Sequence, residues 1–145
     1  MDILSPYIIA AGAGWATAQL TKYVVASVQA KGLASVRQLY LSGHMPSAHS
    51  ATTVALLVVV GLRDGLGSGL FGLALVFTAV VLYDAMMVRR SSGEQGVALT
   101  ALIKEQKSKV PLPRVAIGHT PTEVAAGSLL GAAIGVMVYF MLQAV

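Results

Sequence analysis

Two short stretches of the sequence place histidines among residues that could assist them in phosphate chemistry. One of them, "GHTPTE", contains His119 and Glu123, which lie one turn apart if the stretch is helical. A carboxylate there can fix the imidazole tautomer and stabilise the charged ring, as a histidine base or nucleophile requires. The structural alternative is a capping box of Thr120 and Glu123 with His119 just outside it, and the two interpretations are compatible.

The other stretch, "SGHMPSAHSA", carries Ser47 and His49 at the start of an apolar segment. A helix beginning here offers free backbone N–H groups and the positive end of its dipole, which suit an anion such as phosphate. If both histidine stretches open helices at one face of the protein, they predict a phosphate-binding cradle. The alternatives are an N-cap role for Ser47 and an interfacial polar role for His49.

Ionisable residues inside apolar segments are the next candidates. Lys22, with Gln19 one turn earlier, and Asp84 lie near the same end of their segments, which predicts a buried acid–base pair or a shared site. Arg89 and Arg90 follow Asp84 closely and could bind phosphate bidentately. The alternatives are a Lys22 side chain that reaches the membrane interface and arginines that set the topology.

The composition indicates an integral membrane protein. Of the 145 residues, 56% are hydrophobic and 11% are charged, and the mean hydropathy is +0.75. The absence of cysteine excludes disulfides, thiolate metal sites and cysteine nucleophiles. The net charge of +4 is better explained by topology or anionic lipid than by nucleic acid, which we do not expect as a partner. We predict one domain over residues 1–145, whose first apolar segment is structural because no basic signal-peptide region precedes it.

Four apolar segments predict an all-α, membrane-spanning helical bundle, since about 20 residues cross a bilayer. They cover residues 6–30, 48–62, 67–88 and 121–144, and the second is short. In the polar connection over 89–119, a group of apolar residues is followed by a charged end. This pattern predicts a short interfacial helix stopped by Pro111 and Pro113. With four crossings, both histidine stretches lie at the same membrane face.

Charge predicts which face this is. Eight basic residues flank the histidine stretches: Lys31, Arg37, Arg89, Arg90, Lys104, Lys107, Lys109 and Arg114. Only Arg63 lies at the opposite face, together with Asp64 and Asp2. The positive-inside rule therefore predicts a cytoplasmic site in a cell inner or plasma membrane, although a basic face built for phosphate would produce the same asymmetry.

A ridge of small residues runs along the last apolar segment. Gly127, Gly131 and Gly135 continue the four-residue spacing that begins at His119 and Glu123. Glycines at this spacing permit close contact between membrane helices. The ridge is expected to pack either within the chain or between two copies in a homodimer.

Taken together, "GHMPSAHSA", "YDAMMVRRSSGEQ" and "GHTPTEVAAG" resemble the divergent type 2 phosphatidic acid phosphatase family, which is related to acid phosphatases and vanadium-dependent haloperoxidases. The resemblance extends from Lys22 to the glycine ridge. Pro46-Ser47-Ala48-His49 looks like the superfamily's proline-serine-glycine-histidine motif. His119-Thr120-Pro121-Thr122-Glu123 looks like its histidine-x-x-x-aspartate motif, with glutamate in place of aspartate.

The resemblance implies a role for each candidate residue. His119 would be the nucleophile that forms a phosphohistidine, Glu123 would hold it, and His49 would protonate the leaving alcohol. The phosphate would be bound by Lys22, Arg89, Arg90 and the backbone near Ser47, with Asp84, Gln19, Ser50 and His44 in support. The resemblance implies no metal and no cofactor.

Two departures from the superfamily pattern concern the ligands of the phosphate. An arginine is expected six residues before the nucleophile, where this chain has Pro113 with Arg114 beside it, so Arg114 competes with Arg89 and Arg90. His44 stands where the divergent family usually has glycine.

The resulting prediction is a membrane-embedded phosphatase acting on a lipid phosphomonoester. A cytoplasmic site favours phosphatidylglycerophosphate or phosphatidate, whereas an inverted topology favours polyprenyl phosphates or pyrophosphates. The first alternative is a small transporter or lipid-binding protein, in which Lys22, Asp84 and the histidines line a path. The second is a metal site formed by His44, His49 and His119.

Overall fold

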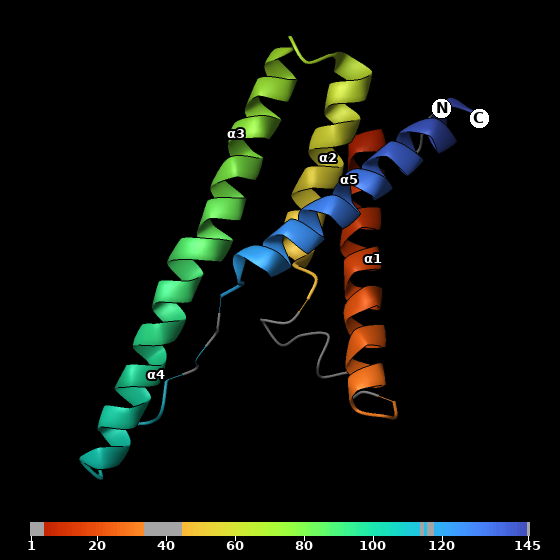
Figure 1. The fold of residues 1–145 in the computed structure, drawn as a ribbon. Coiled ribbons are helices and arrows are strands. Elements are labelled where there is room, and N and C mark those ends of the chain that lie inside the picture. Colours follow the sequence, from red (N-terminus) through yellow and green to blue (C-terminus); the bar gives the residue numbers. More distant parts are fainter. Residues whose placement is uncertain (1–4, 34–44, 114, 116–117, 145) are drawn as a thin grey trace.

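The computed structural model describes residues 5–33, 45–113, 115 and 118–144. These residues form four continuous helices and, within those ranges, no strand, which confirms the all-α prediction (Figure 1). The elements are α1 (Pro6–Gln29), α2 (Ala48–Asp64), α3 (Gly69–Tyr83), the π-helical turn η2 (Asp84–Val88), α4 (Arg89–Glu105) and α5 (Pro121–Gln143). α3, η2 and α4 follow one another without a break.

Local sequence explains where the helices begin. Ser47, Ser68 and Thr120 are the N-caps of α2, α3 and α5, and each side chain accepts a backbone N–H three residues further on. Pro6 and Pro121 occupy the first turns of α1 and α5, where the missing N–H of proline has no cost. These caps place the start of α2 and the start of α5 at defined residues of the two histidine stretches.

Helix α2 lies at the centre of the bundle and contacts α1, α3 and α5 (Figure 1). The buried side chains at these contacts are mostly small: Ala10, Ala18, Ala48, Ala51, Ala55 and Val59. Small residues let helix backbones approach closely, which is how membrane helices gain packing without a hydrophobic driving force.

The glycine ridge of α5 packs against α2 of the same chain. A Cβ atom at Gly127 would overlap the carbonyl oxygen of Ser47, and a Cβ atom at Gly131 would overlap that of Ala51. Gly135 continues the contact one turn later. The ridge is therefore used within the chain, so a homodimer would need another surface.

The predicted separate interfacial helix is wrong. The polar segment after residue 88 is helical, but it continues α3 through η2, where the Arg89 N–H bonds to the Asp84 carbonyl. The change from apolar to polar residues at Arg89 was the basis of the predicted boundary. Hydropathy sets the environment of a helix, but a change from apolar to polar residues does not by itself end its backbone hydrogen bonding.

The predicted stop at Pro111 and Pro113 also lies too far along the chain. α4 ends at Glu105, and Lys107 adopts a left-handed φ of 50°. A left-handed residue after the last turn is a common helix ending that satisfies its final carbonyls. The prolines follow in an extended connection that returns toward α5.

Two helices of the described chain are long and apolar enough to cross a membrane. They are the continuous helix Gly69–Glu105, with 37 residues, and α5, with 23 residues. α2 has 17 residues, fewer than the roughly 20 that cross the hydrocarbon core. Four crossings therefore remain a prediction.

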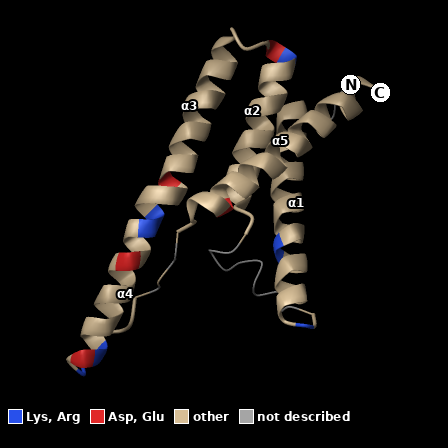
Figure 2. Cartoon of the chain, viewed as in Figure 1, with Lys and Arg blue, Asp and Glu red and all other residues tan. Residues whose placement is uncertain are grey.

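Apolar side chains cover the outside of the candidate spans. Leu73, Val76, Phe77 and Val80 of α3 are 52–68% exposed. Figure 2 shows that α3 carries no charge before Asp84 and that the rest of α5 after its first turn is uncharged. An outer surface of this kind suits lipid hydrocarbon.

Candidate active site

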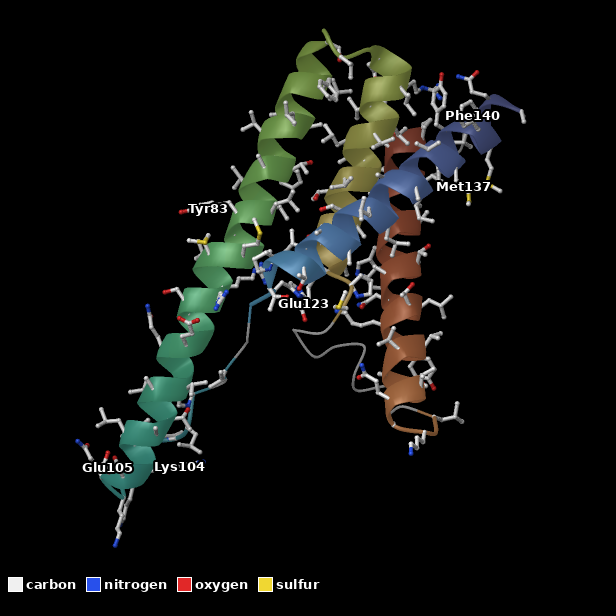
Figure 3. The ribbon with its side chains drawn as sticks, in the orientation of Figure 1. Tyr83, Lys104, Glu105, Glu123, Met137 and Phe140 are labelled. Atoms are coloured by element: carbon white, nitrogen blue, oxygen red, sulfur yellow. The ribbon has the colours of Figure 1, made fainter. Side chains whose placement is uncertain are left out.

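His119 and Glu123 lie side by side at the start of α5. Figure 3 shows Glu123 at the first turn of this helix. The Nδ1 atom of His119 is 3.3 Å from the Oε2 atom of Glu123, and His119 is only 6% exposed. The same carboxylate oxygen accepts the Thr120 backbone N–H at 2.8 Å, and the Thr120 hydroxyl accepts the Glu123 N–H at 3.3 Å. The predicted capping box is thus confirmed, and it holds the carboxylate against the imidazole.

Backbone hydrogen bonds tie this segment to two other elements. The His119 N–H donates to the Ala85 carbonyl of η2 at 3.0 Å. The Ser47 N–H donates to the Glu123 carbonyl at 3.2 Å. The starts of α2 and α5 therefore adjoin, as expected for two helices that open at one face.

The start of α2 contributes a buried serine pair and an exposed histidine. The Ser47 hydroxyl caps α2 and accepts the Ser50 hydroxyl at 2.9 Å, and both side chains are fully buried. The N–H of Ser47 is bonded to Glu123, so a phosphate bound here would meet the amides that follow Ser47. His49 is exposed, and the charges of His119, Lys22 and Arg89 act on its ring.

Lys22 reaches the same place from α1. Its side chain is 8% exposed, and the Glu123 carboxylate is close enough to attract its ammonium group. Gln19 lies half-buried one turn earlier. The predicted pairing of Lys22 with Asp84 is wrong, because Asp84 pairs with Arg89 instead. Burial also argues against a Lys22 side chain that extends to the interface.

The two arginines point to different partners. The Nε atom of Arg89 is 2.5 Å from Oδ2 of Asp84, and the Arg89 charge acts on both His49 and His119. The Nε atom of Arg90 is 3.1 Å from Oε1 of Glu94, one turn further along α4. The charge of Arg89 therefore acts on both histidines, whereas Arg90 lines a pocket together with His119.

A pocket of about 410 Å³ opens beside His119. It is lined by Arg90, Gly93, Glu94, Val97, Gly118, His119 and Thr120. Its walls come from α4 and from the segment that leads into α5, so the buried imidazole has access to a space large enough for part of a ligand.

Burial lowers the pKa of His119 below its usual value, and the nearby charges of Lys22 and Arg89 lower the pKa further. The hydrogen bond and charge of Glu123 raise the pKa but do not cancel the effect of burial. The ring is consequently neutral near pH 7. With Nδ1–H directed at Glu123, the Nε2 atom keeps a lone pair that can attack an electrophile.

Two candidates, His44 and Arg114, lie outside the described residues. In the ranges that the structure describes, no three histidine, aspartate or glutamate side chains are grouped as ligands of one metal ion. The metal hypothesis depends on His44 and so falls outside those ranges.

The contacts made by the backbone before His119 were not predicted from the sequence. Gly118 lies against the backbone of Arg89 and Arg90. Ala85 supplies the carbonyl that accepts the His119 N–H. Glycine immediately before a histidine was the only available signal for this close approach, and nothing marked Ala85.

Comparisons with known proteins agree with the prediction of a membrane protein. The model of the Divergent PAP2 family matches residues 4–134. The uncharacterized membrane protein YuiD of Bacillus subtilis (strain 168) is 33% identical over 117 residues, which cover 70% of this chain and 74% of that protein. No solved structure matches.

Proposed function

We propose, from the premise that this chain belongs to the Divergent PAP2 family, that it is a phosphatase which hydrolyses a lipid phosphomonoester within the membrane. The observation that supports this most is the pairing of buried His119 with Glu123. Lys22 from α1, His49 from α2 and Arg89 from α4 surround the pair. A neutral nucleophile, a second histidine and two cations can together carry out the transfer of a phosphoryl group.

In the first step, Nε2 of His119 attacks phosphorus and the bond from phosphorus to the lipid oxygen breaks. Glu123 accepts Nδ1–H and stabilises the positive charge that develops on the ring, much as the carboxylate of a hydrolase triad does. Protonated His49 donates its proton to the lipid oxygen, which leaves as an alcohol.

In the second step, water attacks the phosphohistidine. His49, now neutral, accepts the proton of the water, and the bond from phosphorus to His119 breaks. Phosphate leaves, and both histidines return to their starting state. One residue can serve as acid and then base because it lies on the side of the phosphorus opposite His119 in each step.

Lys22 and Arg89 would hold the phosphate oxygens. Lys22 is a buried point charge, and Arg89 presents a guanidinium whose Nε is already held by Asp84, which leaves its terminal NH₂ groups for the ligand. Arg90 is paired with Glu94 at the pocket rim, where it can contact the part of the substrate beyond the phosphate.

The membrane arrangement that we propose has four crossings, with this site at the cytoplasmic face. The absence of native cysteine allows a direct test with single cysteines at exposed positions. Gly67→Cys, in the α2–α3 turn, should react with an impermeant maleimide on intact cells, and Ser108→Cys should react only after permeabilisation. The reverse pattern would contradict this orientation and favour polyprenyl phosphates over phosphatidylglycerophosphate or phosphatidate.

The function itself is tested with protein purified in detergent. Wild type, His119→Ala and His49→Ala would be given phosphatidylglycerophosphate, phosphatidate and a polyprenyl pyrophosphate, with EDTA and with or without vanadate. We expect vanadate-sensitive phosphate release by wild type that His119→Ala abolishes. Folded wild type that releases no phosphate and binds no vanadate would contradict the proposal and favour a transporter or lipid-binding protein, for which buried Lys22 is also suited.

A further inference from the structure

The π-helical turn η2 changes the backbone bonding of the long helix where His119 contacts it. The Arg89 N–H bonds to the Asp84 carbonyl, five residues earlier, and the four-residue pattern resumes in α4. When a five-residue pattern returns to a four-residue pattern, one carbonyl is left without a partner inside the helix. Here that carbonyl belongs to Ala85, and it accepts the His119 N–H at 3.0 Å.

The same turn decides which way Arg89 points. In a regular α-helix, side chains five residues apart point in directions about 140° apart, because each residue turns the helix by about 100°. Asp84 and Arg89 are five residues apart, yet their side chains form an ion pair at 2.5 Å. The wider turn therefore brings Arg89 onto the Asp84 face of the helix.

Gly118 lets the segment before α5 approach the start of α4 closely enough for His119 to bond to Ala85. A Cβ atom at Gly118 would overlap the backbone nitrogen of Arg90 and would lie 2.7 Å from the carbonyl carbon of Arg89. A side chain there would have to push the segment away from α4. The backbone bond from His119 to Ala85 lies next to this contact, so it would lengthen or break.

We propose that η2 is the positioning element of the active site. It offers the Ala85 carbonyl to the backbone of His119, and through Asp84 it turns the Arg89 guanidinium toward the phosphate that His119 attacks. This inference rests on the proposed function and deepens it. Ala85, Asp84 and Gly118 are positioning residues, because they act through His119 and Arg89.

The test compares Gly118→Ala with Gly72→Ala. Gly72 is an exposed glycine of α3 whose added Cβ would meet no atom within 4 Å. We expect Gly118→Ala to lower kcat by about 10²-fold, with KM within threefold, because a displacement near 1 Å of a reacting group costs about that much. Gly72→Ala should behave as wild type.

A spectroscopic reading separates displacement of His119 from a loss of folding. The chain has three histidines, so ¹⁵N-histidine labelling with His119→Ala for assignment allows the titration of His119 to be followed. In Gly118→Ala the midpoint should rise toward the ordinary histidine value, since burial is what lowers the pKa of this ring. Unchanged kcat with an unchanged midpoint would overturn the inference and leave the phosphatase proposal standing.

Amide hydrogen exchange tests the bond from His119 to Ala85 in the wild-type protein, without an activity assay and without a variant. The His119 amide precedes α5, yet it should exchange as slowly as amides in the middle of α2, because it is bonded to Ala85. Exchange at the rate of an open loop would overturn the inference even if Gly118→Ala failed to fold. If wild type released no phosphate, the proposed function would fail, and exchange and titration would still decide the role of η2.

Discussion

The two ends of the helical bundle both carry ionisable side chains, but they arrange them differently. At one end, which we call the motif end, Lys22, His119 and Glu123 meet in a site where the lysine and histidine are less than one-tenth exposed. At the other end, which we call the hairpin end, the Tyr7 hydroxyl donates to Asp64 at 2.6 Å in an exposed pair beside the α2–α3 turn. The motif end therefore buries its ionisable side chains, and the hairpin end leaves its ionisable side chains exposed to solvent.

The pockets at the two ends differ in the same way. The pocket at the motif end includes His119, Arg90 and Glu94 among its walls. A pocket near the hairpin end, of about 310 Å³, is lined by apolar side chains and Tyr7. An ion pair in water contributes little, whereas charges that converge from several elements in a buried place can act on a ligand. The number of charges therefore says less about function than the number of elements that bring them together.

Among the substitutions that compare the two ends, the largest effect is expected for Glu123→Gln at the motif end. Glutamine can still accept the Thr120 N–H, so the cap should survive, but the imidazolium formed during attack loses its carboxylate. We expect kcat to fall by about 10³–10⁴-fold. Because Glu123 raises the pKa of His119, the pKa should fall further in the variant.

The pH profile of residual activity checks this prediction. Neutral His119 is the reactive form, so kcat declines as the pH falls through the pKa of His119, and in the variant this acidic limb should move to lower pH. An acidic limb that moved upward would mean that Glu123 does not face the imidazole in the working enzyme.

The next effect is expected for Lys22→Met, which keeps most of the length of the unbranched side chain and removes its charge. We expect kcat/KM to fall by about 10²-fold or more, because a buried cation is lost from the phosphate site. Lys31→Met is the matched control, since Lys31 is exposed just after α1. Equal effects of the two substitutions would show that overall positive charge, not the buried position, is what matters.

A smaller effect is expected for Asp84→Asn compared with Asp64→Asn. The first releases Arg89 at the motif end, and we expect KM to rise by about 10-fold, equivalent to about 1.4 kcal/mol. The second releases Tyr7 at the hairpin end, and we expect KM within twofold of wild type. Steady-state kinetics in one detergent would check both, and a similar rise in KM for both would remove the distinction between the two ends.

The smallest effect is expected for Tyr7→Phe. It removes an exposed hydrogen bond, so the free energy of unfolding should fall by about 0.5 kcal/mol and activity should not change. Thermal unfolding in detergent and the phosphatase assay would measure the two quantities. A loss of activity here would assign the hairpin end a role that its exposure does not suggest.

The sequence by itself determined the local features of this protein. The spacing of His119 and Glu123, with Thr120 between them, was enough to predict the capping box, because a helix start needs only residues within one turn. Composition predicted a membrane protein, and the lengths of the apolar segments predicted that it is all-helical. The resemblance to the divergent phosphatase family was confirmed over residues 4–134.

Only the tertiary structure decided which distant groups meet. It placed Glu123 close enough to Lys22 for their charges to interact, and it paired Asp84 with Arg89, whose charge acts on both histidines. It also joined α3 and α4 through η2 and gave the Ala85 carbonyl to His119. The physical reason is that packing of several elements sets these contacts, and a one-residue change in helical register rotates a side chain by about 100° without any change in the pattern of the sequence.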